Sequence, residues 1–219
     1  MEIARLYLDA QRSFLAFVEP LGAEGWNRPV PCTPGWTVRD VLSHQAGLSD
    51  DVLNGRTDGA GSDPWTGAQV ERWRGTDTPV LIEQWRQQGP QLADLLERFN
   101  QVRPMFDVNT HEHDVRHALG LPGNRTSELV GVMAAGFASA QFPRPITIEF
   151  EDGTAASIGD PSDAAAITLK GVTPFEFVRS RLGRRTRDQV AAYHWSEPLP
   201  ADILDKWFVF GPSQQEIHE

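Results

Sequence analysis

The spacing of the apolar residues changes once along this chain, and the change limits the folds that it can adopt. As far as Phe142, apolar residues recur at three- and four-residue steps, which is the period of amphipathic helices. After Pro143 and Pro145 they alternate with polar residues, as in a strand with one buried face. We therefore expect a mainly helical α+β protein, with a helical domain over residues 1–142 and a small α+β domain over residues 143–219.

The first domain is expected to contain a series of helices joined by loops rich in proline and glycine. The periodicity predicts helices over approximately residues 1–20, 37–48, 81–99, 105–119 and 127–142. Thr37 is suited to be an N-cap, and Asp40 adds an acidic group to the first helical turn. The Gly89-Pro90 pair is expected to kink or divide its helix, and residues 54–79 predict a long irregular connection.

The second domain shows the signals of a short hairpin followed by a helix. Residues 146–150 alternate as a strand, and Asp152-Gly153 is typical of a hairpin turn. Residues 167–169 predict another strand. Thr173-Pro174 is expected to open a helix that Gly183 ends.

Composition excludes several classes of partner and of chemistry. The formal net charge is −10, and the 20 Lys and Arg residues form no long basic run, which argues against nucleic acid. No apolar run approaches the roughly 20 residues that a membrane-spanning helix needs, and a signal peptide is not expected, so a cytoplasmic protein without a membrane partner is predicted. The single cysteine, Cys32, excludes an internal disulfide and a multi-cysteine zinc site.

Two pairs of potential metal ligands compete on the helix predicted over residues 105–119. Asp107 and His111 form one pair and His113 and His117 the other, each with the four-residue spacing that places both side chains on one helix face. At roughly 100° per residue, Asp107 and His111 lie at or within the apolar arc, whereas His113 and His117 lie on the polar side. The inward pair is therefore Asp107 and His111, and the other two histidines are expected to be solvated.

His44 joins this pair as a third candidate, because it lies on an apolar stripe with Val41 and Leu48. Two imidazoles and a carboxylate are typical of an open catalytic metal site with a position left for water or substrate. Zinc suits this set, and nickel, iron or manganese stay open. Two simpler interpretations also stay open, namely a hydrogen-bonded core histidine and an Asp107–His111 ion pair without metal.

Two segments of the chain resemble the mycothiol-dependent maleylpyruvate isomerase family of DinB-like metalloenzymes. They are Cys32 to His44 (CTPGWTVRDVLSH) and Phe106 to Pro122 (FDVNTHEHDVRHALGLP). The resemblance implies a DinB-type four-helix bundle that binds a divalent metal, usually zinc, through His44, Asp107 and His111. The best-known isomerase pattern has Glu at the position of Asp107, so the carboxylate arm here is one methylene shorter.

The resemblance also implies a chemistry. In this family the metal binds the sulfur of mycothiol, the low-molecular-weight thiol of actinobacteria, and the thiolate attacks a small electrophile. Addition and elimination across a double bond give a cis-trans isomerase, whereas a retained adduct gives a thiol S-transferase. Cys32 is not needed as a nucleophile in either reaction.

The family's C-terminal domain contributes an arginine to the active site. The candidates in this chain are Arg179, Arg181, Arg184 and Arg185. Arg184 and Arg185 are the preferred catalytic pair for binding anionic groups, against the alternative that they only solvate the surface. A metal-dependent hydrolase and a non-catalytic ligand sensor remain rival functions, and the chain is expected to be a monomer or a homodimer.

Overall fold

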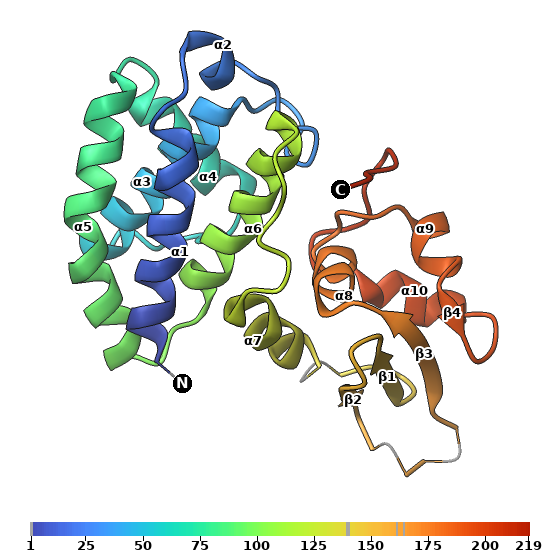
Figure 1. Ribbon diagram of the computed structural model, residues 1–219. Coiled ribbons are helices and arrows are strands. Elements are labelled where there is room, and N and C mark those ends of the chain that lie inside the picture. The colour runs from blue at the N-terminus through green and yellow to red at the C-terminus, as the bar shows by residue number, and fades with distance from the viewer. Residues whose placement is uncertain (1, 139–140, 161, 164) are drawn as a thin grey trace. The chain divides into compact units, whose positions relative to one another are not determined.

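The computed structural model describes residues 2–138, 141–160, 162–163 and 165–219 (Figure 1). Residue contacts divide the chain into an N-terminal unit, Met1–Gly123, and a C-terminal unit, Asn124–Glu219. The first unit is helical and the second combines helices with a sheet, so the predicted α+β class is confirmed. The division falls before the predicted domain boundary near Phe142, because the last predicted helix of the first domain packs within the second unit.

The N-terminal unit is built on a four-helix bundle in which α1 and α3 each pack against both α5 and α6. This arrangement agrees with the DinB-type bundle expected from the sequence. Aromatic and aliphatic side chains such as Tyr7, Phe14 and Trp85 are fully buried in its core. The helices of the unit are α1 (Ile3–Val18), α2 (Ala23–Trp26), α3 (Val38–Leu53), α4 (Asp63–Trp73), α5 (Thr78–Arg98) and α6 (Arg103–Leu119).

Helix α3 begins where its capping residues predict. The Thr37 backbone N–H donates to Asp40 Oδ2 at 2.8 Å, and the Asp40 backbone N–H donates to Thr37 Oγ1 at 3.3 Å, which forms a capping box. The helix ends at Leu53 and not near Leu48, so its last turns include Asp51. The extension brings Asp51 into contact with Gln69 of the neighbouring helix α4.

Helix α4 lies within residues 54–79, which the sequence predicted as an irregular connection, so that prediction was wrong for this part. Pro64 occupies the first turn of the helix, where its missing N–H costs no hydrogen bond. Only Gln69 and Val70 of its residues are buried, which explains the weak apolar periodicity. The helix forms because it packs against α3, a contact between segments that local patterns do not show.

The contact between α3 and α4 depends on Gly47, because a Cβ atom there would lie 2.6 Å from Gln69 Cβ. We expect Gly47→Ala to lower the free energy of unfolding by about 1–3 kcal/mol, the usual cost of overpacking. Gly67→Ala on α4 is the matched control, since its Cβ would meet open space, and it should leave stability unchanged or slightly higher. Denaturant titration of both variants measures this difference, and equal stabilities would contradict the close approach.

Helix α5 continues through Pro90 without the division that was one of the two predicted outcomes. Gly89 leaves room for Gln11, whose Nε2 donates to the Trp85 carbonyl oxygen at 2.7 Å. A side chain from α1 thus contributes a buried hydrogen bond in the turn before the proline. Helix α6 ends as predicted at Gly120, which adopts the left-handed conformation with φ of 67°.

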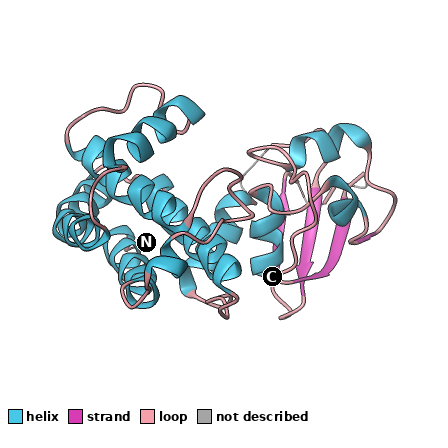
Figure 2. Cartoon of the chain, turned by 90° about the horizontal axis from the view of Figure 1, so that it is seen from above, coloured by secondary structure: helices cyan, strands magenta, loops and turns pink. Residues whose placement is uncertain are grey.

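The C-terminal unit contains a mixed sheet in the order β2-β1-β3-β4. Strand β1 pairs antiparallel with β2 and parallel with β3, and β3 pairs antiparallel with β4; Figure 2 shows these strands side by side in magenta. The strands are β1 (Ile146–Phe150), β2 (Ala155–Ile158), β3 (Ile167–Val172) and β4 (His194–Trp195). The helices are α7 (Glu128–Phe137), α8 (Pro174–Arg181), α9 (Arg187–Ala191) and α10 (Ala201–Trp207).

Helix α7 is shorter than predicted and packs against α8. It ends at Phe137, whereas the sequence predicted a helix to Phe142, of which residues 139–140 lie outside the described part of the chain. Helix α8 begins after its predicted N-cap Thr173, whose hydroxyl accepts from the Glu176 backbone N–H at 3.0 Å. The expected turn at Asp152-Gly153 joins β1 and β2.

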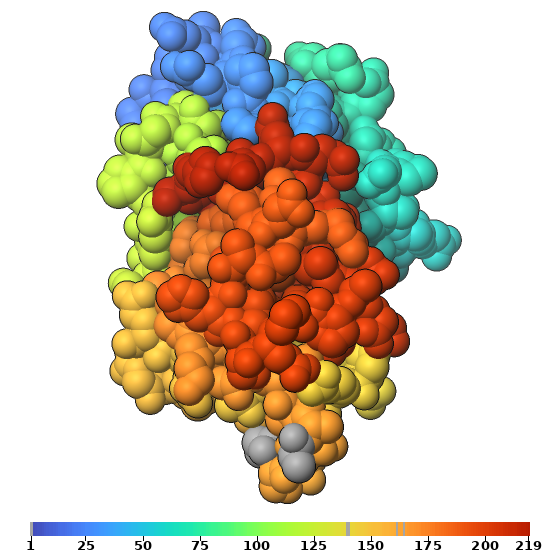
Figure 3. All heavy atoms as spheres, turned by 90° about the vertical axis from the view of Figure 1, so that its right-hand side faces the viewer, coloured from blue at the N-terminus to red at the C-terminus, as the bar shows by residue number. Residues whose placement is uncertain are grey.

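The segment after α10 returns across the surface of the C-terminal unit, where it is dark red in Figure 3. Backbone N–H groups of Val209 and Ser213 donate to the carbonyl oxygens of Arg181 and Arg185 at 2.8 and 3.0 Å. Ile217 is buried further along the same segment. Within the described residues of both units, no helix has the length and apolar character needed to cross a membrane.

Candidate metal centre

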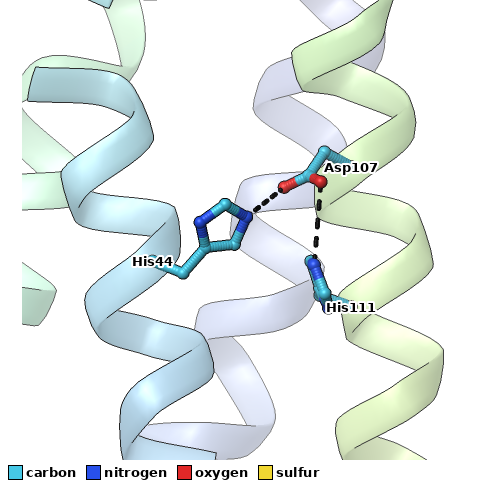
Figure 4. Close-up of side chains that lie close together, drawn as sticks. All are labelled: His44, Asp107 and His111. Atoms are coloured by element: carbon cyan, nitrogen blue, oxygen red, sulfur yellow. Dashed lines mark hydrogen bonds and ion pairs between the residues drawn. The ribbon is translucent and has the colours of Figure 1, made fainter. Parts of the chain in front are cut away.

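His44 from α3 and Asp107 and His111 from α6 lie together in the N-terminal unit, as Figure 4 shows. His44 Nε2 is 3.1 Å from Asp107 Oδ2, and His111 Nε2 is 3.6 Å from Asp107 Oδ1. One potential ligand atom from each residue lies within 4.8 Å of the others. The four-residue spacing on α6 brings the carboxylate and one imidazole to the same face, and the bundle places His44 opposite them.

The donor set fits a divalent metal ion. Around a tetrahedral ion with bonds of about 2.0–2.2 Å, ligand atoms are about 3.3–3.6 Å apart, close to the two separations measured at Asp107. The imidazoles are nearly buried, while the Asp107 side chain is 30% exposed, so the centre is accessible on the side of its carboxylate. A carboxylate held between two imidazoles is stabilised by a positive charge, which a bound metal ion or a protonated imidazole would supply.

The Asp107 carboxylate and the His44 imidazole shift each other's pKa values. Burial alone would raise the pKa of Asp107, but the neighbouring His44 and His111 lower that pKa well below its usual range. Burial likewise opposes protonation of His44, yet the charge and hydrogen bond of Asp107 prevail and raise the pKa of His44. Asp107 is therefore ionised and ready to bind a cation throughout the neutral range.

Further side chains form hydrogen bonds with two of the three candidate ligands and approach the third, and sequence patterns did not identify them. Gln45 Nε2 donates to Asp107 Oδ2 at 2.6 Å, and His44 Nδ1 lies 2.7 Å from Gln69 Oε1. His111 Nδ1 lies 3.1 Å from a carboxylate oxygen of Asp114, which is fully buried. The hydrogen bonds to His44 and Asp107 are of the kind typical behind metal ligands, because they orient the His44 ring and the carboxylate.

The support of His44 extends through Gln69 to a buried carboxylate. Gln69 Nε2 donates to Asp51 Oδ2 at 2.9 Å. Asp51 Oδ1 accepts from Arg56 Nε at 2.8 Å and from Arg72 Nη1 at 2.7 Å. Burial raises the pKa of Asp51, but the hydrogen bonds from Arg72, Gln69 and Arg56 outweigh it and lower that pKa.

Trp36 borders the candidate centre. Its ring centroid lies 5.3 Å from that of His44 and 6.2 Å from that of His111, and its plane is stacked on the His111 ring. The side chain is half-buried and directly precedes the N-cap of α3. It therefore gives the two imidazoles an aromatic wall, which the position of Trp36 in the sequence motif did not by itself indicate.

The prediction that His113 is solvated was wrong, since the residue is only 3% exposed. His117 is half-buried. The physical reason is that all residues of α6 from Val108 to Val115 are buried, so angular position does not separate an inner from an outer face there. Neither histidine joins a potential metal-binding group among the described residues.

Arg184 and Arg185 lie in the C-terminal unit and are both buried, so they do not simply solvate its surface. Arg185 forms a two-point ion pair with Glu176, with distances of 2.7 and 2.6 Å, and also contacts Glu219 Oε2 at 3.1 Å. Arg184 Nη1 donates to the Leu182 carbonyl oxygen at 2.9 Å. A catalytic role for the two arginines stays a prediction.

Comparison with known proteins adds a family and a fold. Residues 7–131 match the family described as the mycothiol maleylpyruvate isomerase N-terminal domain. The crystal structure of the mycothiol-dependent maleylpyruvate isomerase is similar, with a TM-score of 0.54 and 11% identity over 92% of this chain and 95% of that chain. A His-to-Ala mutant of that enzyme gives a TM-score of 0.54 and 10% identity over the same shares. No curated protein matches the sequence at a significant level.

Proposed function

Because the chain belongs to the mycothiol maleylpyruvate isomerase N-terminal domain family, we propose that it is a mycothiol-dependent metalloenzyme. It acts on a small electrophile in the cytoplasm, by cis-trans isomerisation or by thiol S-transfer. The observation that carries the proposal is the convergence of His44, Asp107 and His111 in the domain that defines the family.

These three residues would hold a divalent metal, and zinc suits two imidazoles and a carboxylate. A metal bound there would lower the pKa of a coordinated thiol and leave its sulfur nucleophilic near neutral pH. Three protein ligands leave a position for that thiol. The partial exposure of Asp107 supports access for the thiol and its substrate from this side.

The residues around the ligands hold them in place and shape the site. Gln45 fixes one oxygen of Asp107, while Gln69 and Asp114 contact the imidazole nitrogens that face away from the carboxylate. The ring of Trp36 packs beside both imidazoles, where it would limit the access of water on that side. A fixed and partly dry site strengthens charge interactions at the reacting sulfur.

In the isomerase reaction the thiolate sulfur forms a bond to one carbon of a cis double bond, and the electron pair moves to the neighbouring carbon framework. Rotation about the resulting single bond, followed by loss of the thiolate, restores the double bond in the trans geometry without consuming thiol. In the S-transfer reaction a proton from solvent completes the adduct, and the carbon–sulfur bond persists. Both reactions require the same nucleophile.

Arg184 and Arg185 form the second element of the proposal, as cations for anionic groups of the thiol or the substrate. Their burial supports strong charge interactions. Glu176 and Glu219 already balance the charge of Arg185, so an anion binding to Arg185 would displace one of these carboxylates.

Thermal unfolding of the zinc-loaded protein with mycothiol tests the proposal. At a mycothiol concentration 100 times its Kd, we expect a stabilisation of about 2.7 kcal/mol, which follows from binding to the folded state alone. Mycothiol with a methylated sulfur is the control and should stabilise far less, because its sulfur cannot become a thiolate.

A panel of small electrophiles then identifies the reaction. Thiol-dependent isomerisation or adduct formation is the expected result. Hydrolysis of esters or amides without any thiol would contradict the proposal and favour a metal-dependent hydrolase. Mycothiol binding without turnover of any electrophile would favour a sensor.

A further inference from the structure

We propose that Asp51 and Gln69 keep the Nε2 atom of His44 available to bind the metal. They do so because they hold a hydrogen-bond acceptor next to its Nδ1 atom. Both are positioning residues, since neither reaches the space between the three candidate ligands. The inference rests on the proposed metal site and adds the feature that decides which ring nitrogen binds.

Asp51 determines the orientation of the Gln69 amide. Gln69 Nε2 lies 2.9 Å from Asp51 Oδ2, and an ionised carboxylate accepts hydrogen bonds but donates none. The amide NH₂ group must therefore face Asp51. The amide oxygen consequently faces His44, with Oε1 2.7 Å from Nδ1.

Two arginines keep Asp51 ionised, which this orientation of the Gln69 amide requires. Arg56 and Arg72 both donate to Oδ1, which leaves Oδ2 to accept from Gln69. Asp51 is 2% exposed, and a buried carboxylate with two guanidinium partners stays ionised. The amide thus has no favourable alternative orientation while Asp51 is present.

The orientation of the Gln69 amide determines which ring nitrogen of His44 carries the proton. An oxygen at 2.7 Å from Nδ1 requires that Nδ1 carries the proton. A metal requires the neutral imidazole, which has one N–H, so its lone pair would be on Nε2, the atom that without metal donates to Asp107 Oδ2 at 3.1 Å. A metal ligand must offer this lone pair, and it points toward the other two candidate ligands.

The packing of α3 on α4 places these residues side by side. His44, Gly47 and Asp51 follow each other on α3 at steps of three and four residues, so they share the face that meets α4. Gln69 is fully buried against this face, and Gly47 provides the space for its side chain. The three residues of α3 therefore all contact the same residue of α4, Gln69.

Replacement of Asp51 by asparagine tests the proposal, with Asp50→Asn as the matched control. Asparagine both donates and accepts, so it allows the Gln69 amide to turn its NH₂ group toward His44. Asp50 shares Arg56 and Arg72 with Asp51 but has no contact with Gln69 in the described hydrogen bonds. We expect D51N to weaken zinc binding roughly 10–100-fold, the usual effect of losing a residue that orients a ligand, and D50N to bind as the native protein does.

Nitrogen-15 NMR of histidine-labelled protein gives a second measurement that needs no catalysis. In the native protein and in D50N, the Nδ1 proton of His44 should exchange slowly with water, both with zinc bound and in metal-free protein kept mildly acidic. In D51N this exchange should be faster. Gln69→Met, which keeps the volume of the side chain but removes the acceptor, should reproduce both effects and provides a second variant if D51N unfolds.

Zinc bound through Nδ1, or a D51N protein with native zinc affinity and native proton exchange, would overturn the inference. The proposed function fails in a different way. If zinc binding responds to D51N as expected but no mycothiol-dependent reaction is found, the positioning role stands and the enzymatic proposal does not.

Discussion

Replacement of His111 by alanine is expected to abolish zinc binding at the candidate centre. The change removes one of the three candidate ligands, so its effect should exceed the roughly 10–100-fold loss that follows from removing a residue behind a ligand. His111 lies 3.6 Å from Asp107 and contacts Asp114, and alanine retains neither contact. All thiol-dependent activity should disappear with the metal.

His117→Ala is the control for this experiment, because His117 lies on the same helix, is half-buried and takes no part in the cluster. Metal analysis of both purified variants after zinc loading and dialysis gives the result directly. Equal zinc content in the two variants would refute the assignment of His111 as a ligand. Circular dichroism of both proteins would show that the overall helical content is retained.

Replacement of Glu219 by alanine is expected to lower the stability of the C-terminal unit by about 3–5 kcal/mol, the usual cost of breaking a buried ion pair from one side. Glu219 contacts Arg179 through two hydrogen bonds of 2.8 and 2.6 Å and also contacts Arg185. Arg179 is 1% exposed and Glu219 is 4% exposed in this pair. Removing the carboxylate therefore leaves buried positive charge poorly compensated.

Glu216→Ala provides the comparison, since Glu216 pairs only with the exposed His218 in the described ion pairs and should contribute at most about 1 kcal/mol. Denaturant unfolding of the full chain, followed by tryptophan fluorescence, measures both changes. Trp207 is fully buried in the C-terminal unit and is suited to report on it. A Glu219→Ala variant as stable as Glu216→Ala would show that the pair contributes little.

Local patterns in the sequence predicted much of the fold. The capping residues Thr37 and Thr173 predicted the starts of α3 and α8, and Gly120 predicted the end of α6. The four-residue spacing of Asp107 and His111 also identified them as one of two candidate pairs, and the structure places this pair beside His44. These features follow from residues close together in the chain, so periodicity and capping rules suffice to find them.

The parts that the sequence did not predict depend on contacts between distant residues. Gln69 is an ordinary polar residue in a segment with weak periodicity, and only the packing of α4 on α3 brings it to His44. The burial of His113 arises because α6 is enclosed over a whole segment, which an angular projection of one helix does not reveal. The pairing of Arg185 with Glu219 likewise joins residues that no local pattern connects.

The shallow burial of α4 has a consequence for the lifetime of the proposed metal complex. Gln69 and Val70 are its buried residues, so lifting this helix from α3 exposes much less apolar surface than unfolding the bundle does. Local opening of α4 would withdraw the amide behind His44 while α1, α3, α5 and α6 remain folded. For the proposed metal complex, we therefore expect the rates of uptake and release to follow the local opening of α4 more closely than the global unfolding of the domain.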